Sequence, residues 1–166
     1  TNDGQSPLAS LGSLVLAIPA GQEKSIAQTR SFASMYCAAT AMAATLAADN
    51  DALAAMDDLP SVGERLIRDY EDLAKALGSN LDLDRIYYLG SGARYGLACE
   101  ANLKMKEMTL THSEPFHFLE FRHGPKSMVD SSALVVGLLS DRNHIHEASV
   151  LKEMKQLGGH TLALGE

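Results

Sequence analysis

The chain alternates between short apolar runs and longer stretches with helical periodicity. Four runs are nearly continuous in hydrophobic residues and end at glycine, proline or polar residues, which is typical of buried strands in a parallel sheet. These runs cover residues 13–20, 85–90, 132–140 and 160–166. The helical stretches cover residues 25–48, 61–78, 96–108 and 146–158. Strands that are separated by helices predict an α/β fold with a parallel sheet.

Local signals suggest where the first two helices begin and end. The stretch 25–48 is rich in alanine, and Pro60 and several acidic residues follow it. Ser61 and Glu64 then have the S-x-x-E spacing of a capping box, in which the serine binds a free amide at the start of a helix. The second helix is therefore predicted to begin at Ser61 and to end near Gly78.

A glycine turn, GSGARYG, joins the strand at 85–90 to the next helix. Glycines at such a junction let a ligand approach the backbone, and a helix N-terminus favours anions. The turn does not have the dinucleotide-binding fingerprint, because Tyr95 occupies the place of the third glycine, which falls at Gly96. A tight strand-to-helix turn is the simpler interpretation of these glycines.

Two stripes of side chains run along the predicted helix at 96–108. The apolar stripe consists of Leu97, Ala101, Met105 and Met108. The charged stripe contains Glu100, Lys104 and Glu107, whose spacing places them on one face of a helix. Taken alone, the charged stripe is most simply a solvated surface with ion pairs that stabilise the helix.

Composition and charge narrow the classes of function. The chain has 166 residues, of which 46% are hydrophobic, so it can bury a core and is not expected to be disordered. Its formal net charge of −7 disfavours binding to a nucleic-acid backbone, which needs a basic face. We expect a soluble cytoplasmic protein, because no apolar run reaches about 18 residues and the N-terminus lacks the order of a signal peptide.

Neither a disulfide nor a metal site is expected. Cys37 and Cys99 lie singly in apolar helical patterns and are predicted to be reduced core residues. Side chains with zinc-ligating atoms gather in one segment: His112, Glu114, His117, Glu120 and His123. Their spacing does not match the two-histidine zinc motifs, so we predict no metal and no cofactor. His144 and His146 are predicted to begin a helix and to be exposed.

The segments LGSGARYGLACEANLKMKE and FRHGP together resemble the SIS (sugar isomerase) domain family. The resemblance is to the phosphosugar isomerase module of glucosamine-6-phosphate synthase and to related amino-sugar-phosphate deaminases and isomerases. The upstream segment SPLASLGSLVLAIPAGQEKSIAQTRSF resembles the late part of a first SIS domain in that family.

The resemblance implies a flavodoxin-like three-layer α/β/α fold with a parallel sheet. Residues 1–50 would be the late part of a first SIS domain, and residues 51–166 would be connector helices and the early part of a second. Compared with the family, the chain would then lack the upstream loop that grips the sugar phosphate and a downstream lysine. Since the predicted sheet ends on an uncovered strand, we also expect the chain to self-associate.

The resemblance assigns roles to three side chains. Glu107 would move a proton between C1 and C2 of the sugar, and Lys104 would stabilise the oxyanion that forms. His123 would open the sugar ring, and in relatives this histidine reaches the site of a neighbouring subunit, which implies a homodimer. Each role suits its residue type, because a carboxylate, an ammonium and an imidazole can carry out these steps near neutral pH.

Candidate substrate-binding residues are Gly90, Ser91, Gly92, Ile26 and Gln28. Gln28 stands where the synthase has a serine that touches the sugar, so the substrate is expected to differ. The expected activity is aldose–ketose isomerisation of an amino-sugar phosphate or another 6-phosphate, with or without deamination. Two alternatives are a non-catalytic sugar-phosphate sensor and the isomerase part of a glutamine–fructose-6-phosphate aminotransferase, which would need a glutaminase domain in addition.

Overall fold

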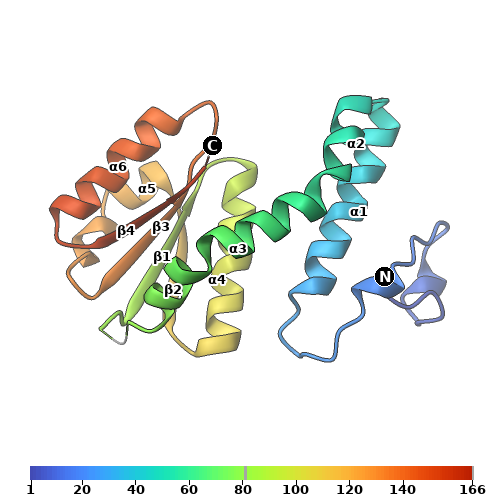
Figure 1. The fold of residues 1–166 in the computed structure, drawn as a ribbon, viewed down its shortest axis with the longest axis horizontal. Helices are drawn as coiled ribbons and strands as arrows, with labels where there is room; N and C mark the ends of the chain where they lie inside the picture. Colours follow the sequence, from blue (N-terminus) through green and yellow to red (C-terminus); the bar gives the residue numbers. More distant parts are fainter. Residues whose placement is uncertain (81, 166) are drawn as a thin grey trace. The chain divides into compact units, whose positions relative to one another are not determined.

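The chain forms two compact units, Thr1–Gly78 and Ser79–Glu166. Figure 1 presents it as a computed structural model, which describes residues 1–80 and 82–165. The first unit consists of η1 (Ala9–Leu11), η2 (Pro19–Gly21), α1 (Arg30–Ala47), α2 (Asn50–Asp57) and α3 (Leu59–Gly78). The second unit consists of β1 (Arg85–Gly90), α4 (Ala93–Thr109), β2 (His112–His117), α5 (Phe118–Arg122), η3 (Pro125–Met128), β3 (Ala133–Leu138), α6 (His144–Gln156) and β4 (His160–Leu164).

The strand predicted at 13–20 is wrong, because this segment is irregular and leads into the short turn η2. An apolar run becomes a strand only where a neighbouring strand can pair with its backbone. All the strands that the structure describes belong to the second unit. Leu14 is accordingly 74% exposed.

The predicted capping box is also wrong. Helix α3 begins at Leu59, so Ser61 lies inside its first turn, where its hydroxyl donates to the carbonyl of Asp58 at 2.9 Å. The predicted end at Gly78 is confirmed. An additional short helix, α2, precedes α3, and the side chain of Asp49 caps it by accepting from the amide of Ala52 at 2.9 Å.

The first unit buries few of its apolar side chains. Among its described residues, the buried hydrophobic ones are Ala9 and Ala44, and Cys37 is partly exposed rather than in a core. Helix α3 carries a row of exposed apolar residues: Leu59, Leu66, Ile67, Tyr70 and Leu73. The polar contacts of this unit therefore matter more than usual for its local order.

One such contact is made by Glu23, whose carboxylate binds the start of α1. It accepts bonds from the amide and the hydroxyl of Ser31 at 3.0 and 2.6 Å, and from the amide of Arg30 at 3.2 Å. These bonds satisfy backbone donors that the first turn of a helix leaves free. They also fix the loop that contains Ile26 and Gln28.

The pKa of Glu23 is lowered to about 2, first because the hydroxyl and amide of Ser31 donate to its carboxylate. Because this pKa is lowered, the stabilisation is present above the ordinary carboxyl pKa of about 4.3 and is lost as the pH falls towards 2. We expect an NMR titration of the Glu23 carboxyl to have its midpoint near pH 2. Glu23→Gln should speed amide exchange at Ser31 at neutral pH, whereas Glu71→Gln should leave it unchanged. A midpoint near 4.3 would contradict this prediction.

The second unit is a parallel sheet with helices on both faces, as predicted. The strand order is β2-β1-β3-β4, and every neighbouring pair is parallel. Helix α4 lies on one face, and α5 and α6 lie on the other (Figure 1). The order corresponds to the first four strands of a flavodoxin-like sheet.

Strand β2, with the sequence HSEPFH, was missed by the sequence analysis, because it contains no apolar run. Its position at the edge of the sheet explains this composition: an edge strand pairs on one side only and tolerates proline and charged residues.

Alternation along β1 divides the core between the two faces. Tyr87 and Leu89 pack with α5 and α6, whereas Ile86 packs on the other side in a cluster that Met105 of α4 joins. The apolar stripe predicted for α4 is only partly right. Ala98 and Asn102 are the buried residues of this helix, whereas Leu97 and Met108 are 39% and 62% exposed. Cys99 is half-buried and free.

Candidate active site

Lys104 lies between two carboxylates on helix α4. Its Nζ is 2.7 Å from Oε2 of Glu107 and 3.4 Å from Oε1 of Glu100. The side chains of Lys104 and Glu100 are 18% and 20% exposed, and that of Glu107 is 37% exposed. The structure thus brings together the predicted base and the predicted cation, and adds a second carboxylate to them.

This group points away from the sheet. Each residue of an α-helix is rotated by about 100° from the one before, so Glu107 lies roughly 180° around the axis from the buried Ala98. Lys104 and Glu100 fall near the same outward face. Glu107 is therefore available to a ligand that rests on the outer surface of α4.

The charge state of Lys104 follows from its neighbours. Its pKa is raised, first because it donates a hydrogen bond to Glu107 and further because of the negative charge of Glu100. Lys104 is thus a firmly protonated ammonium beside a carboxylate. That combination can accept a proton at one atom while stabilising a negative oxygen at another.

His123 lies on the other face of the sheet. It follows α5, whose Phe118 and Phe121 belong to the core cluster of α5 and α6. Helix α4, with Lys104 and Glu107, covers the opposite face (Figure 1). Within one chain the sheet therefore separates the predicted histidine from the predicted base and cation.

The glycine turn lies at the carboxyl end of β1, far from Glu107. Glu107 is about 22 Å along the helix axis from Gly92, since an α-helix rises about 1.5 Å per residue. A single hexose phosphate cannot touch both points. The structure thus brings Gly90, Ser91 and Gly92 together with one another but not with the charged group of α4.

Two of these glycines have a clear structural reason. A Cβ on Gly90 would lie 2.4 Å from the carbonyl oxygen of Arg94 and 2.7 Å from the amide nitrogen of Tyr95. Gly92 has φ +57° and ψ −129°, a backbone conformation that residues with a Cβ rarely adopt. The turn is therefore a close approach of strand and helix, which agrees with the simpler interpretation of the sequence.

We expect Gly90→Ala to destabilise the second unit by about 1–3 kcal/mol or more, because the new methyl group overlaps backbone atoms that cannot rotate away. Gly96→Ala, in the first turns of α4, is a matched control in the same strand-to-helix segment. A Cβ at Gly96 would meet nothing within 4 Å, so this change should stabilise by about 0.5–1 kcal/mol. Denaturant unfolding measures both. Equal effects of the two substitutions would contradict this account of the turn.

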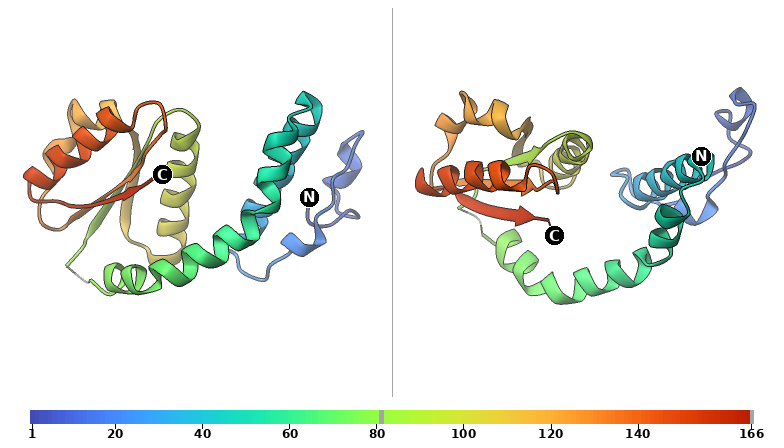
Figure 2. Two further views of the ribbon diagram at one scale, coloured as in Figure 1. Left: turned by 45° about the horizontal axis from the view of Figure 1, so that its top comes forward. Right: turned by 90° about the horizontal axis from the view of Figure 1, so that it is seen from above.

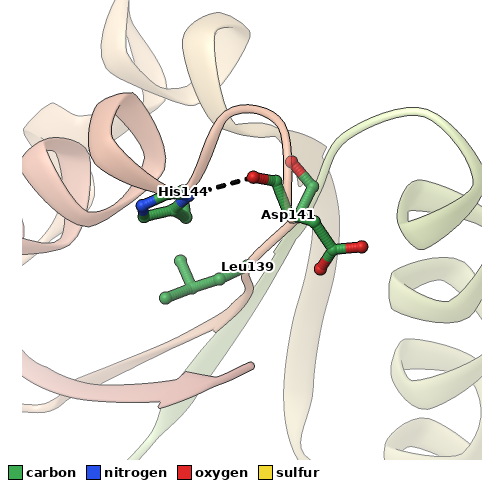
Figure 3. Close-up of a pocket in the computed structure, with 4 residues that line it drawn as sticks. Leu139, Asp141 and His144 are labelled. Carbon is green, nitrogen blue, oxygen red and sulfur yellow. Dashed lines mark hydrogen bonds between the residues drawn. The ribbon is translucent and has the colours of Figure 1, made fainter. Parts of the chain in front are cut away.

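The carboxyl edge of the sheet also contains a hollow of about 220 Å³. It is lined by Leu139, Ser140, Asp141 and His144, and the ring of His144 bonds the carbonyl of Asp141 at 3.0 Å (Figure 3). The connection that leaves β1 leads through α4 to β2 on one side, whereas the connection that leaves β3 leads through α6 to β4 on the other side. Ligands of open α/β sheets often bind beside such a switch point. Oδ1 of Asp141 forms an ion pair with Nη2 of Arg94 at 2.9 Å, which links this loop to the start of α4.

The remaining candidate residues lie in an exposed loop or at the start of a helix. Ile26 is 99% exposed and Gln28 is exposed, both in the loop that Glu23 fixes. His144 and His146 are exposed and begin α6, as predicted. In residues 1–80 and 82–165, no three His, Cys, Asp or Glu side chains lie close enough to hold a metal ion.

A contact that the sequence analysis missed joins Tyr95 and His117, whose rings stack at 3.9 Å between centroids. The pKa of Tyr95 is raised, first by its hydrogen bond with Cys99. The sequence holds no signal for this pair, because it depends on the end of the unpredicted strand β2 lying beside the start of α4.

Comparisons with known proteins match the second unit to one protein family. The family model described as SIS domain matches residues 81–165. A glutamine–fructose-6-phosphate aminotransferase (isomerizing) from Sulfurisphaera tokodaii is 30% identical over 165 residues, which cover 99% of this chain and 28% of that protein. The enzyme of the same name from Legionella pneumophila (strain Lens) is 28% identical over 158 residues, covering 89% of this chain and 26% of the enzyme.

Solved structures give a similar result. The crystal structure of glucosamine-6-phosphate deaminase from Thermotoga maritima matches with a TM-score of 0.84 and 28% identity over 99% of this chain and 50% of that chain. Tagatose-6-phosphate ketose/aldose isomerase from Escherichia coli shares the fold, with a TM-score of 0.71 and 24% identity over 97% of this chain and 46% of that one. This chain thus spans about half the length of these solved chains and about a quarter of the aminotransferases. None of the described helices has the length and hydrophobicity that crossing a membrane requires.

Proposed function

Since the chain belongs to the SIS domain family, we propose that it takes part in the aldose–ketose isomerisation of a hexose 6-phosphate. The observation that carries this proposal is the ammonium of Lys104 bonded at 2.7 Å to the outward-facing carboxylate of Glu107. Isomerisation needs a base that moves a proton between C1 and C2 and a positive charge near the oxygen that becomes negative. The pair on α4 supplies both.

In the proposed reaction, the carboxylate of Glu107 removes the proton from the carbon beside the carbonyl and returns it to the other carbon. The enediolate formed between these steps carries negative charge on the former carbonyl oxygen, which the ammonium of Lys104 stabilises. The proton of the neighbouring hydroxyl moves to this oxygen before the other carbon is protonated, so that the carbonyl re-forms one carbon along. Glu100 keeps the charge of Lys104 partly compensated while Glu107 carries the proton. No metal or cofactor is needed for these steps.

We propose that His123 opens the sugar ring at the site of another subunit. This division is supported by the position of His123 directly after α5, which covers the opposite face of the sheet from α4 with Glu107. A homodimer in which each site combines α4 of one chain with His123 of its partner is the simplest arrangement. Sedimentation of the full-length gene product should therefore detect self-association.

The finer assignment rests on the relatives. Several of them are named for amino-sugar reactions, so glucosamine 6-phosphate and fructose 6-phosphate are the first substrates to test. Residues 1–50 would then be the late part of a first SIS domain, and residues 51–166 connector helices and the early part of a second. Gly90, Ser91 and Gly92 would shape the strand-to-helix junction, and Ile26 and Gln28 would contact substrate from the upstream segment.

The experiment that tests this proposal is an assay of the full-length gene product with fructose 6-phosphate and glucosamine 6-phosphate, in which hexose products and ammonia are measured separately. Isomerisation without ammonia indicates a simple isomerase, and release of ammonia from glucosamine 6-phosphate indicates a deaminase. Tight binding of both sugars with no product from either would contradict catalysis and favour a sensor.

A further inference from the structure

A single carboxylate on α6 bonds to both sides of the turn that carries His123. Glu153 forms a two-point ion pair with Arg122, with Nη2–Oε1 at 2.5 Å and Nε–Oε2 at 3.1 Å. The same Oε2 is 3.6 Å from Nζ of Lys126. Arg122 directly precedes His123, and Lys126 follows it after glycine and proline, so the histidine turn lies between the two cations that Glu153 binds.

The turn has few other anchors. Phe121 before it and Val129 after it are buried, at 0% and 7% exposure, but the residues between them are mostly exposed. Backbone bonds close the two ends, from the amide of His123 to Glu120 at 3.1 Å and from the amide of Ser127 to Gly124 at 3.0 Å. Among the described residues, no hydrogen bond or ion pair holds the imidazole of His123 itself.

The geometry of the Glu153 contact makes it stiffer than an ordinary surface ion pair. An exposed pair with a single bond usually contributes little, because two long side chains must be ordered to form it. A planar guanidinium that meets a carboxylate at two points is fixed in direction as well as in distance. Glu153 is also only 25% exposed and projects from a helix whose Met154 is fully buried, so its own position is well defined.

We propose that Glu153 is a positioning residue for His123, and that it acts by holding the Arg122–Lys126 turn at the distance from α6 at which the imidazole can reach a sugar ring. This proposal rests on the proposed function, in which His123 opens the ring. A displacement of about 1 Å in a catalytic group can cost up to about 10²-fold in rate, so even a modest loosening of this exposed turn should be measurable. Because the effect passes through His123, it should fall on the reaction of closed sugar rings.

The test compares two probes, fructose 6-phosphate and 5-deoxyfructose 6-phosphate, which cannot close its ring because the hydroxyl is missing. Glu153→Gln in the full-length protein should slow turnover of the first roughly tenfold and leave that of the second nearly unchanged. Arg122→Gln removes the same contact from the other side and should change the ratio of the two turnover rates by the same factor. Glu71→Gln, which breaks the exposed helical pair with Lys75 at 2.7 Å, is the matched control and should change neither rate.

The double variant His123→Asn with Glu153→Gln separates positioning from general stabilisation. If Glu153 acts through His123, adding Glu153→Gln to His123→Asn should cause no further loss in the ratio of the two rates. Equal slowing of both probes by Glu153→Gln, or additive effects in the double variant, would overturn the positioning role. An unchanged ratio in His123→Asn alone would instead overturn the ring-opening role of His123 in the proposed function, and the positioning role with it.

Discussion

Replacing Glu107 by glutamine is expected to lower the turnover of a hexose 6-phosphate by roughly 10²-fold or more, because the amide has a similar shape but cannot accept the proton. The free energy of unfolding should change by at most about 1 kcal/mol, since the side chain of Glu107 is 37% exposed and pairs with Lys104 at the surface of α4. Steady-state rates and denaturant unfolding of the same preparation measure both quantities.

The matched control for this substitution is Glu71→Gln. Glu71 also pairs with a lysine on a helix, at 2.7 Å from Lys75, but no catalytic role is assigned to it. If the charged residues of α4 are only a solvated surface, both substitutions should have the same small effect on turnover. If turnover is kept when Glu107 is replaced, the charged group of α4 is a surface feature and not a base with its cation.

Mixing two inactive variants should restore activity. If each site combines Glu107 of one chain with His123 of its partner, a dimer of one Glu107→Gln chain and one His123→Asn chain has one intact site and one doubly altered site. Random exchange of equal amounts makes half of the dimers mixed, so about one quarter of the wild-type activity should return. The measurement is turnover after the two proteins have been unfolded and refolded together.

Controls for the mixing experiment are each variant refolded alone and the two variants mixed without subunit exchange. Both should remain at their own low rates. A further control refolds wild-type chains with chains that carry both Glu107→Gln and His123→Asn. Each site of such a mixed dimer contains one altered residue, so only the wild-type dimers should be active. If the two single variants fail to complement although mixed dimers form, the two residues serve the same chain or His123 has another role.

Much of the second unit could be predicted from its apolar runs. Strand β1 was predicted because its apolar residues lie close together in the sequence. In the structure, Ile86, Tyr87 and Leu89 are buried on the two faces of the sheet, as a central parallel strand requires. Strand β2 could not be predicted in the same way, because its place at the edge removes the need for apolar residues. The apolar run at 13–20 was wrongly predicted as a strand, because it has the composition of a strand but no neighbouring strand among the described residues to pair with.

The contacts of the candidate site could be predicted only partly from the sequence. The spacing of Lys104 and Glu107 on one helix predicted their contact, since side chains three residues apart are neighbours on a helix. The separation of His123 from this pair depends on which face of the sheet each helix covers, and no local pattern encodes that choice. Figure 2 presents the arrangement of α4, α5 and α6 around the sheet from two further directions. The role of Glu153 was equally hidden, because it is far along the sequence from the turn that it binds.

The most direct test of the central claim is the incorporation of solvent deuterium into the sugar, followed by NMR in D₂O with fructose 6-phosphate and glucosamine 6-phosphate. Proton transfer between C1 and C2 through the carboxylate of Glu107 predicts that the full-length wild-type protein introduces deuterium at one of these carbons. It also predicts that Glu107→Gln slows this incorporation by roughly 10²-fold or more. Undiminished incorporation by the Glu107→Gln protein would contradict the assignment of Glu107 as the base, and with it the isomerase site on α4.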